Sequence, residues 1–501
     1  MSLSSSMFPA FGSLQVVLLV VLCVIAALVL FGRPRNLPPG PRGLPIVGNA
    51  ISIVKDAPVL VFTDWSKTYG DVFTIYFGPR RTIVLNGYAA IHEALVKNAE
   101  DFSSRTQSQA SFVPDGKTLG IVREPYGRKW KEHRKFALMS LRDFGVGKRS
   151  MEGKILEEAR ALGDEIYTKD SRAFCISQMM QNAVSNVICS IVFGCRYEYD
   201  DIEFKVLLEA IDGIFSRNVG VTILTQLFPP TRFLPGARKH YQKLKQNEAK
   251  LMDHIRKRIK EHEETFDSND IRDFIDAFLL ESKKRHGDDN SNFSEQEHAT
   301  IVYHLFLAGT DTTSTTLRWA LLYMILHPDI QGKVQQEIDS VLGPNLEPSM
   351  VYRSQMPYTE ATLTEVLRLA PVAPLTIPHG TSNDTVFRGY NIPKETSVTV
   401  NIWSVHRDPN LWPGPDKFDP TRFLDDSGKY VRRDEVIPFS IGRRVCLGEQ
   451  LARMEIFLIF TSLLQRFTFK LPEGAPKPSE EGVHGATYQP KPFMLMAEPK
   501  E

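Results

Sequence analysis

The sequence predicts a mainly α protein with a minor β-sheet region, organised as one large folded unit behind an N-terminal membrane segment. The chain has 501 residues, of which 42% are apolar and 10% aromatic, a composition typical of a large globular core. Apolar residues recur at helical spacing over long stretches, whereas strand-like runs are short. The expected helices are roughly 151–168, 172–194, 238–265, 270–285, 295–327, 330–342, 358–369 and 447–465, and the expected strands lie at 71–86, at 384–402 and at the C-terminal end.

The first 32 residues predict a membrane anchor. The stretch Leu14–Phe31 is apolar except for Gln15, and no lysine or arginine precedes Arg33. At a rise of about 1.5 Å per residue, a helix of this length just spans a bilayer core. A cleaved signal peptide is the alternative, but it would have a basic start and a shorter apolar stretch. Arg33, Arg35 and Arg42 follow the segment, so the positive-inside rule places the rest of the chain in the cytosol.

The rest of the chain divides into a stiff connector and one long unit. Residues 33–48 contain the proline-rich run Leu37–Gly48, whose prolines fix φ and remove backbone donors, so we expect a non-helical hinge. Residues 49–501 show no repeat, low-complexity tract or second linker and form the expected single domain. With 60 Lys+Arg against 59 Asp+Glu, the net charge of +1 gives no global attraction to nucleic acid.

A single cysteine carries the first chemical signal. The chain has five cysteines, and their spacing is typical neither of a disulfide framework nor of a zinc site. Cys446 stands directly before the apolar run 447–467, where a helix N-terminus and neighbouring arginines are expected to lower the thiol pKa. Gly442 and Gly448 allow tight turns at which a flat group can approach closely. A solitary thiolate suits an axial haem ligand, and a buried structural cysteine is the alternative.

The spacing around this cysteine resembles a known signature. Phe439, Gly442, Arg444, Cys446 and Gly448 fill every fixed position of the haem-binding signature of the cytochromes P-450, the haem-thiolate monooxygenases. The resemblance implies the cytochrome P-450 fold, haem b (iron protoporphyrin IX) as cofactor, and Cys446 as the metal ligand. It covers the chain from the membrane segment almost to the end. It is closest to the microsomal family-2 group, whose sequences are similar to this one at 186–194, 356–360 and 403–408.

A second motif interrupts the helix expected at 295–327. Asp311–Thr316 are six consecutive Asp, Thr and Ser residues, which are poor helix formers whose hydroxyls can bond backbone carbonyls. The helix can therefore open into a bulge that holds water or dioxygen. The resemblance implies that Asp311 and Thr312 are the catalytic acid–alcohol pair that relays protons, whereas the alternative is a threonine-rich packing seam. Ser294 and Glu297 have the pattern of a capping box at the helix start.

A third motif pairs two charges on one helix face. Glu365 and Arg368 are three residues apart in the helix expected at 358–369. An exposed pair of this kind contributes about 1 kcal/mol or less, whereas a buried pair needs a further partner for its remaining donors and acceptors. The resemblance supplies that partner, because it implies that Arg422 completes a structural triad with Glu365 and Arg368.

The resemblance also implies haem contacts and a substrate pocket. Cations and donors are expected around haem propionates, and Trp130 and Arg134 share one helix face. For His379 the alternative is a hydrogen-bonded loop histidine. The implied haem contacts are Arg105, Trp130, Arg134, Ala308, His379, Phe439, Arg444 and Cys446. The implied pocket is mostly apolar and suits a lipophilic substrate. It is formed by segments 106–123, 211–224, 301–312, 371–377 and 484–488. The lining residues that the resemblance implies are Phe112, Val113, Phe215, Leu305, Ala308, Ala373, Leu375 and Ile377.

One charged residue stands near this apolar lining. We hypothesise that Arg123 reaches the cavity mouth and pairs with a fatty-acid carboxylate, and a solvated loop arginine is the alternative. Equal turnover of a fatty acid and its methyl ester by the wild type would exclude the pairing.

Electrons are expected from another protein. The sequence contains no Gly-x-Gly-x-x-Gly after a strand and no P-loop, so no nicotinamide or nucleotide site is evident. By resemblance, NADPH-cytochrome P-450 reductase is the donor and cytochrome b5 a further partner. Basic residues near the haem-binding segments either dock an acidic reductase or are ordinary solvated charges: Arg128, Lys129, Lys131, Lys135, Arg432, Arg433 and Arg443.

Together these patterns favour a monooxygenase of the endoplasmic reticulum membrane with its catalytic domain on the cytosolic side. It would insert one atom of dioxygen into a fatty acid, eicosanoid, steroid or xenobiotic. A haem-thiolate isomerase or dehydratase, which rearranges peroxides without external electrons, is the second hypothesis, and the intact Asp311–Thr312 pair argues against it. A haem-dependent lipid-binding or sensor protein is the third, but it would need neither a proton relay nor an electron-transfer surface.

Overall fold

The computed structural model describes residues 20–21, 36–44, 47–78, 80–106, 120–215, 221, 225, 229–285 and 291–500. Its α-helices are α2 (Ala50–Lys55), α3 (Pro58–Tyr69), α4 (Tyr88–His92), α5 (Ala99–Phe102), α6 (Gly120–Arg123), α7 (Arg128–Asp143), α8 (Arg149–Tyr167), α9 (Ser177–Val192), α10 (Ile202–Ile214), α12 (Pro235–Glu264), α13 (Phe274–Lys284), α14 (Glu295–Leu326), α15 (Pro328–Leu342), α16 (Pro357–Leu369), α17 (Ile402–His406) and α18 (Glu449–Arg466). Short turns of 3-10 or π type are η1 (Glu93–Lys97), η3 (Pro229–Phe233), η4 (Met350–Gln355) and η5 (Pro420–Phe423). The mainly helical class is as predicted.

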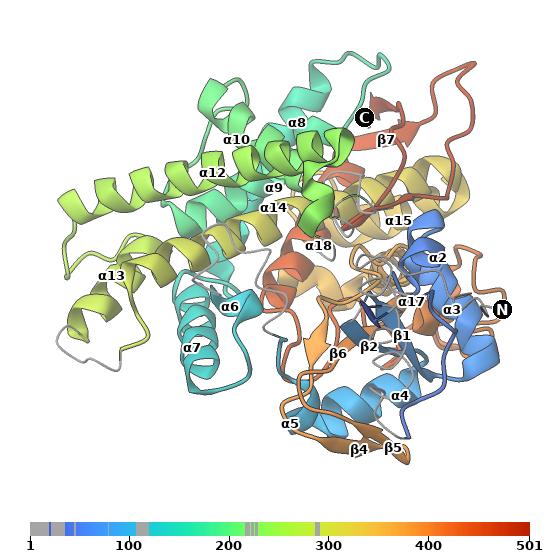
Figure 1. Ribbon diagram of the computed structural model, residues 1–501. Helices are drawn as coiled ribbons and strands as arrows, with labels where there is room; N and C mark the ends of the chain where they lie inside the picture. Colours follow the sequence, from blue (N-terminus) through green and yellow to red (C-terminus); the bar gives the residue numbers. More distant parts are fainter. Residues whose placement is uncertain are drawn as a thin grey trace, which may run out of the picture.

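Helix α14 forms the centre of the helical part. In Figure 1 it crosses the molecule beneath α12, and it packs against α9, α12, α16 and α18. It is buried on almost every side because its apolar residues occur all round the helix and not on one stripe. Helix α18 is likewise buried over most of its length. The contact between α14 and α18 brings the second motif and the cysteine segment into one core.

The main sheet lies beside this core, close to α2 and α3 (Figure 1). Its order is β1-β2-β6-β3, from β1 (Val72–Phe77), β2 (Arg80–Leu85), β6 (Ser397–Val400) and β3 (His379–Gly380). The β1–β2 hairpin is antiparallel, β6 adds parallel to β2, and β3 adds antiparallel to β6. Three two-stranded antiparallel sheets complete the strands: β4 (Thr385–Phe387) with β5 (Tyr390–Ile392), β7 (Phe467–Lys470) with β10 (Met496–Pro499), and β8 (Val483–His484) with β9 (Tyr488–Gln489).

The eight predicted helices are all present, with bounds shifted by a few residues. The largest shift is at α9, which begins at Ser177 and not at residue 172. The predicted helices do not include the short helices α2, α4, α5, α6 and α17 or the longer α3, α7 and α10, although Trp130 and Arg134 of α7 are expected to share a helix face. In α7 most residues are charged or polar, and the buried stripe is thin, so its helical period is weak in the sequence; the stripe is Trp130, His133, Ala137, Ser140 and Leu141. Ser294 caps α14 as predicted, since its hydroxyl accepts the N–H of Glu297 at 3.2 Å.

The predicted membrane anchor, residues 1–32, lies outside the described residues except for Val20 and Val21, which are helical and exposed. Among the helices of the described ranges, none is both long and apolar enough to cross a membrane. Residues 36–44 of the predicted hinge are non-helical and lie against the main sheet. There Thr74 of β1 donates its N–H to the carbonyl of Pro39 and its hydroxyl to the carbonyl of Pro38, both at 2.8 Å.

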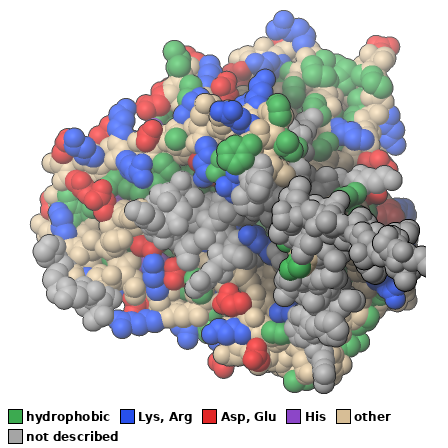
Figure 2. Space-filling view, in the orientation of Figure 1, with side chains coloured by type: hydrophobic (Ala, Val, Ile, Leu, Met, Phe, Trp, Pro, Cys, Tyr) green, Lys and Arg blue, Asp and Glu red, His purple; other side chains and the backbone are tan. Residues whose placement is uncertain are grey.

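Charges of both signs are mixed on the molecular surface. On the face shown in Figure 2, basic and acidic side chains are interspersed over the left-hand part, where α12 and α13 lie in Figure 1. This mixture agrees with the net charge of +1.

Candidate functional site

Cys446 lies in a tight loop that leads into α18. Gly442 has a φ of 81°, and a Cβ at this position would run into the backbone carbonyl of Leu95, so the loop requires glycine here. The N–H of Cys446 donates to the carbonyl of Phe439 at 3.0 Å. The backbone thereby fixes the cysteine two residues before Gly448, the N-cap of α18.

Opposing influences act on the pKa of the Cys446 thiol. Its side chain has accessible surface, but protein surrounds it closely enough that burial raises the thiol pKa. The backbone N–H groups of Gly448 and Glu449 and the charge of Arg134 lower this pKa, as predicted, but they do not outweigh desolvation. The predicted lowering influences are therefore present, and desolvation acts against them. A cation at the sulfur is what would hold it as thiolate.

Guanidinium groups gather beside this loop. Arg444 donates from Nε to the carbonyl of Ser103 at 2.7 Å and from Nη2 to that of Glu124 at 2.6 Å. Its guanidinium carbon lies 4.1 Å from the ring centre of Trp130. Arg134 donates to the carbonyl next to the cysteine, that of Val445, at 2.7 Å. Burial lowers the pKa of Arg444 to about 9, so this group keeps its charge at neutral pH.

Arg105 and His379 come from different segments and meet at strand β3. Arg105 is buried and donates to the carbonyls of Ile377 at 2.8 Å and Pro378 at 3.0 Å. His379 donates from Nδ1 to the carbonyl of Phe102 at 2.8 Å. Burial and the neighbouring charge of Arg105 lower the pKa of His379, so the ring is neutral. A neutral ring protonated at Nδ1 offers Nε2 only as an acceptor, and a carboxylate partner would require a second proton.

The second motif forms a continuous α-helix, and the predicted bulge is wrong. The hydroxyl of Thr312 donates to the carbonyl of Ala308 at 2.9 Å, and the neighbouring hydroxyls bond carbonyls four residues back in the same way: Thr310 to Phe306, Ser314 to Thr310 and Thr316 to Thr312. These bonds lie alongside the backbone ladder and do not replace it, so α14 stays regular from Glu295 to Leu326. Ala308 is exposed and Thr312 half-buried, although most of α14 is buried.

Asp311 points to a different partner from that of Thr312. It is buried, and its Oδ2 accepts the hydroxyl of Thr487 at 2.9 Å while its Oδ1 accepts Nε2 of Gln489 at 3.2 Å. Burial raises the pKa of Asp311 to about 6, with a further increase from Asp212 and opposing effects of Thr487, Arg318 and Gln489. Asp311 can therefore gain or lose a proton near neutral pH. The sequence places Thr487 in the implied pocket segment 484–488 but connects neither it nor Gln489 to Asp311, because no local signal joins residues this far apart in the chain.

The third motif is a buried ion-pair cluster. Arg368 donates from Nε and Nη2 to the two carboxylate oxygens of Glu365, at 2.6 and 2.8 Å, and both side chains are fully buried. Arg422 reaches the same carboxylate at 3.3 Å, and the N–H of Asp419 donates to it at 3.0 Å. The remaining guanidinium donors bond backbone carbonyls, namely those of His406, Pro415 and Lys417 for Arg368 and of Pro413 and Gly414 for Arg422.

The implied pocket residues differ in exposure. Leu305 is buried, and Phe215, Ala373 and Leu375 are half-buried. Ile377 is 43% exposed. Phe112 and Val113 lie outside the described residues.

Arg123 is half-buried near α14. Burial lowers its pKa to about 10, and the neighbouring Tyr303 acts in the opposite direction. Its charge helps burial to lower the pKa of His304 to about 3. Arg123 therefore faces the part of α14 that precedes the second motif.

The predicted basic patch is partly neutralised by its own acids. Lys129 pairs with Glu297 and Glu124. Arg128, Arg432, Arg433 and Arg443 pair with Glu132, Asp434, Glu435 and Glu100. Lys131 and Lys135 are exposed. The patch is therefore a mixed surface, and a docking role stays a prediction.

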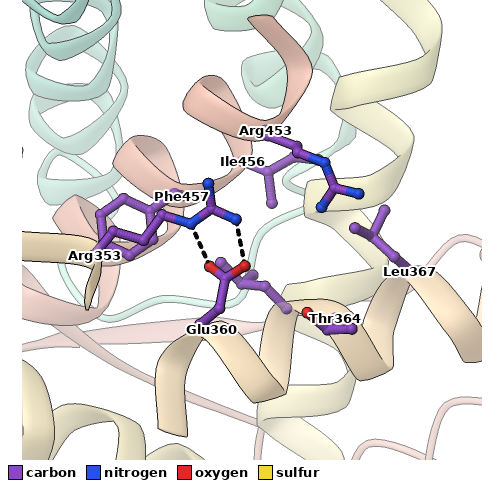
Figure 3. A pocket seen from close by; sticks show the side chains of 8 residues that line it. Arg353, Glu360, Thr364, Leu367, Arg453, Ile456 and Phe457 are labelled. Carbon is purple, nitrogen blue, oxygen red and sulfur yellow. Dashed lines mark hydrogen bonds and ion pairs between the residues drawn. The ribbon is translucent and has the colours of Figure 1, made fainter. Parts of the chain in front are cut away.

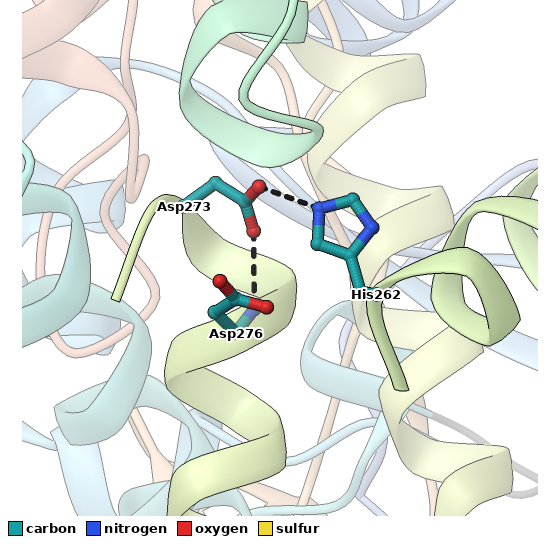
Figure 4. A group of neighbouring side chains, drawn as sticks. All are labelled: His262, Asp273 and Asp276. Carbon is teal, nitrogen blue, oxygen red and sulfur yellow. Dashed lines mark hydrogen bonds and ion pairs between the residues drawn. The ribbon is translucent and has the colours of Figure 1, made fainter. Parts of the chain in front are cut away.

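Two further clusters of charged side chains lie beside α16 and between α12 and α13. A narrow cleft between η4, α16 and α18 has the Arg353–Glu360 ion pair, which joins η4 to α16, on one side and Arg453 of α18 on the other (Figure 3). His262, Asp273 and Asp276 could in principle hold a metal ion (Figure 4). However, Nε2 of His262 bonds Asp273 at 2.7 Å, and Asp276 forms a two-point ion pair with Arg272. The His262–Asp273 bond joins α12 to the start of α13, and both Asp276 oxygens are already bonded to Arg272.

The residues around Cys446 fit a flat cofactor with an anionic edge. Cys446, in the loop before α18, and Ala308, in the largely buried α14, present accessible surface. Nη1 of Arg444 is buried without a hydrogen-bond partner among the described residues, and propionates accept bonds from such donors. One sulfur ligand with guanidinium donors beside it is a donor set that can hold a haem iron and its propionates.

Comparison with known proteins agrees with this fit. A family profile described as Cytochrome P450 matches residues 38–497. Cytochrome P450 2U1 of Homo sapiens is 41% identical over 492 residues, covering 92% of this chain and 89% of the relative. Cytochrome P450 2J2 of Homo sapiens is 41% identical over 473 residues, covering 93% and 92%. Cytochrome P450 2D14 of Bos taurus is 40% identical over 497 residues, covering 98% of each chain.

Proposed function

This chain belongs to the cytochrome P450 family of haem-binding oxidoreductases that incorporate oxygen, and we propose that it is a membrane-bound monooxygenase of lipophilic substrates. Electrons come from NADPH through NADPH-cytochrome P-450 reductase, with cytochrome b5 as a further partner. The catalytic domain, residues 49–501, lies on the cytosolic side of the endoplasmic reticulum membrane behind the anchor at 1–32. Support comes from the family-2 relatives and from the apolar N-terminal sequence.

The observation that carries the proposal is the placement of Cys446. Its loop presents a sulfur at the start of α18, on the accessible side of the loop and beside Arg134 and Arg444. Haem, when bound, supplies the activation of dioxygen. Cys446 would be its iron ligand, Phe439 and Ala308 would pack against it, and Arg105, Trp130, Arg134, His379 and Arg444 would contact its edge.

Asp311 and Thr312 are the proposed proton donors. Asp311 holds a proton at Oδ2 or releases it near neutral pH, because its pKa is raised to about 6. The hydroxyl of Thr312 donates to the carbonyl of Ala308, next to the exposed face of α14. To pass a proton toward that face, the hydroxyl must turn away from this carbonyl.

The substrate is proposed to be a fatty acid, eicosanoid, steroid or xenobiotic. Leu305, Leu375 and Ile377 supply apolar surface near the second motif and β3. Arg123 is the proposed partner of a carboxylate. For this arginine, Arg123→Ala should slow turnover of a fatty acid and leave that of its methyl ester unchanged.

The decisive experiment is product analysis with NADPH, a microsomal reductase and a panel of lipids and drugs. We expect products heavier by one oxygen atom, and lower yield per NADPH in Thr312→Ala. Rearranged products formed without NADPH would instead identify an isomerase.

A further inference from the structure

A small hairpin reaches the Asp311 carboxylate from the far end of the sequence. Thr487, which precedes β9, donates to Oδ2 at 2.9 Å, and Gln489, which lies in β9, donates to Oδ1 at 3.2 Å. Nε2 of Gln489 also donates to the hydroxyl of Thr487 at 3.1 Å. Thr487 is buried, like Asp311 itself. The carboxylate thus lies in a cage of two neutral side chains that come from one hairpin.

The same hairpin touches the elements of the implied substrate pocket. The N–H of Tyr488 donates to the carbonyl of Val372 at 2.8 Å. At the hairpin tip, a Cβ on Gly485 would lie 3.7 Å from the carbonyl of Phe215, so the tip lies against the end of α10. Trp319 of α14 donates from Nε1 to the carbonyl of Tyr488 at 3.0 Å. The hairpin therefore joins the pocket wall, the end of α10 and the helix that carries Asp311.

The donor chemistry decides where a proton on Asp311 resides. The amide Nε2 of Gln489 can only donate, so Oδ1 must remain an acceptor. The hydroxyl of Thr487 can donate or accept, so Oδ2 can be protonated if that hydroxyl rotates. The bond from Gln489 to Thr487 Oγ1 holds the hydroxyl in place in either state. Release of the proton from Oδ2 is then accompanied by rotation of Thr487 back to the donor position.

Two charges also act on Asp311 from neighbouring elements. Asp212 of α10 and Arg318 of α14 influence it in opposite directions. Asp212 accepts a hydrogen bond from Gln181 of α9 at 2.8 Å. These groups contribute to the field around the carboxylate but leave its two oxygens to the hairpin.

We propose that Thr487 and Gln489 are positioning residues for Asp311, and that the β8–β9 hairpin couples the fit of substrate against residues 371–377 and Phe215 to proton delivery. The coupling rests on the proposed function, whereas the positioning of the carboxylate does not. Substrate that shifts the hairpin changes the two bonds that hold Asp311.

The first test measures the carboxyl group itself in the full-length protein. The infrared band of the protonated Asp311 carboxyl is identified as the carboxyl band that Asp311→Asn lacks. Its intensity is then measured as a function of pH. We expect a midpoint of about 6 in the wild type. In Thr487→Val the midpoint should rise by about half a unit to one unit, because a bond to the ionised form is lost. Gln489→Met should raise it as well.

Matched variants separate positioning from damage to the fold. Thr487→Ser keeps the hydroxyl and should restore the wild-type midpoint. Ser479→Ala removes a hydroxyl that bonds Glu481 and Lys491 close to the same hairpin, and should leave the midpoint unchanged. An unshifted midpoint in both Thr487→Val and Gln489→Met would overturn the positioning role.

The second test uses the reductase-supported reaction. Thr487→Val should form several-fold less oxygenated product per NADPH, while Thr487→Ser and Ser479→Ala match the wild type. In the wild type, a substrate that fills the pocket should shift the infrared midpoint. No shift with any bound substrate would overturn the coupling. A wild type that makes no oxygenated product would refute the proposed function, and the titration would still decide the positioning role.

Discussion

Glu365 and Asp311 are two buried carboxylates in neighbouring parts of the core, and their hydrogen-bond partners differ in charge. Glu365 is fully buried and accepts bonds from Arg368, Arg422 and the N–H of Asp419. Asp311 is 3% exposed and accepts bonds from one hydroxyl and one amide. The first carboxylate is surrounded by cations, whereas the second is held by neutral groups.

The difference separates a structural charge from a group suited to proton exchange. The arginines of Glu365 are themselves fixed by backbone carbonyls of the segment 406–417, so the cluster ties α16 to the chain that precedes the Cys446 loop. Asp311 receives too little compensation for its burial, and its pKa rises to about 6. Neighbouring cations keep a buried carboxylate ionised, whereas neutral donors leave it able to exchange a proton.

The largest effect is expected from breaking the compensated pair. Arg368→Met leaves a buried carboxylate without its main partner, and we expect a loss of about 3–5 kcal/mol in stability. The measurement is the thermal unfolding midpoint together with the yield of thiolate-haem protein. Arg353→Met, which breaks the less buried pair with Glu360, is the control and should cost less. Equal losses in the two variants would contradict the role given to the cluster.

Asp311→Asn tests the other member of the comparison. Turnover should fall about 100-fold if the carboxyl donates protons in the rate-limiting step. Because the folded pKa lies above the ordinary value of 3.8, its stabilising contribution is present below pH 3.8 and is lost as pH rises through about 6. The variant should therefore be as stable as the wild type or more stable at pH 7.5. Lower stability there would show a structural carboxylate like Glu365.

Glu455 extends the comparison to an acid with still less compensation. It is 2% exposed on α18, and burial raises its pKa to about 8, opposed by a hydrogen bond with Thr313. Its contribution to stability is full below pH 4.5 and is lost as pH rises through about 8. Glu455→Gln should therefore gain about 1–3 kcal/mol relative to the wild type at pH 8, and less at pH 5. Unfolding midpoints at the two pH values provide the test, and a constant difference would contradict the assignment.

The smallest effect on stability is expected at Asp273, whose cationic partner His262 can itself lose its proton. Burial is the largest single effect on the pKa of His262 and lowers it. Hydrogen bonding and the charge of Asp273 together outweigh burial, so the pKa of His262 is raised. Its contribution is therefore complete below pH 6.5 and is lost as pH rises through the higher folded value. His262→Gln should cost about 1 kcal/mol at pH 6 and less at pH 9. A cost that grew with pH would reverse the sign of this argument.

Much of the candidate site could be predicted because its signals are local. The loop residues Gly442 and Cys446 and the helix pair Glu365 and Arg368 each lie within one short segment whose geometry follows from residue type. The predicted bulge at Asp311–Thr316 failed because hydroxyls can bond carbonyls without breaking the helix. The desolvation that opposes a low pKa of Cys446 could not be predicted, because it depends on all the surrounding elements.

The sequence by itself determined the family and the helical class and pointed to the proposed site residues, since periodicity and motif spacing are properties of contiguous chain. Only the tertiary structure decided what those residues meet. Thr487 and Gln489 lie more than 170 residues from Asp311, with 176 and 178 positions separating them. Burial, hydrogen-bond partners and therefore pKa arise from segments brought together by packing. That is why the sequence places the acid, while the fold sets whether it can exchange a proton.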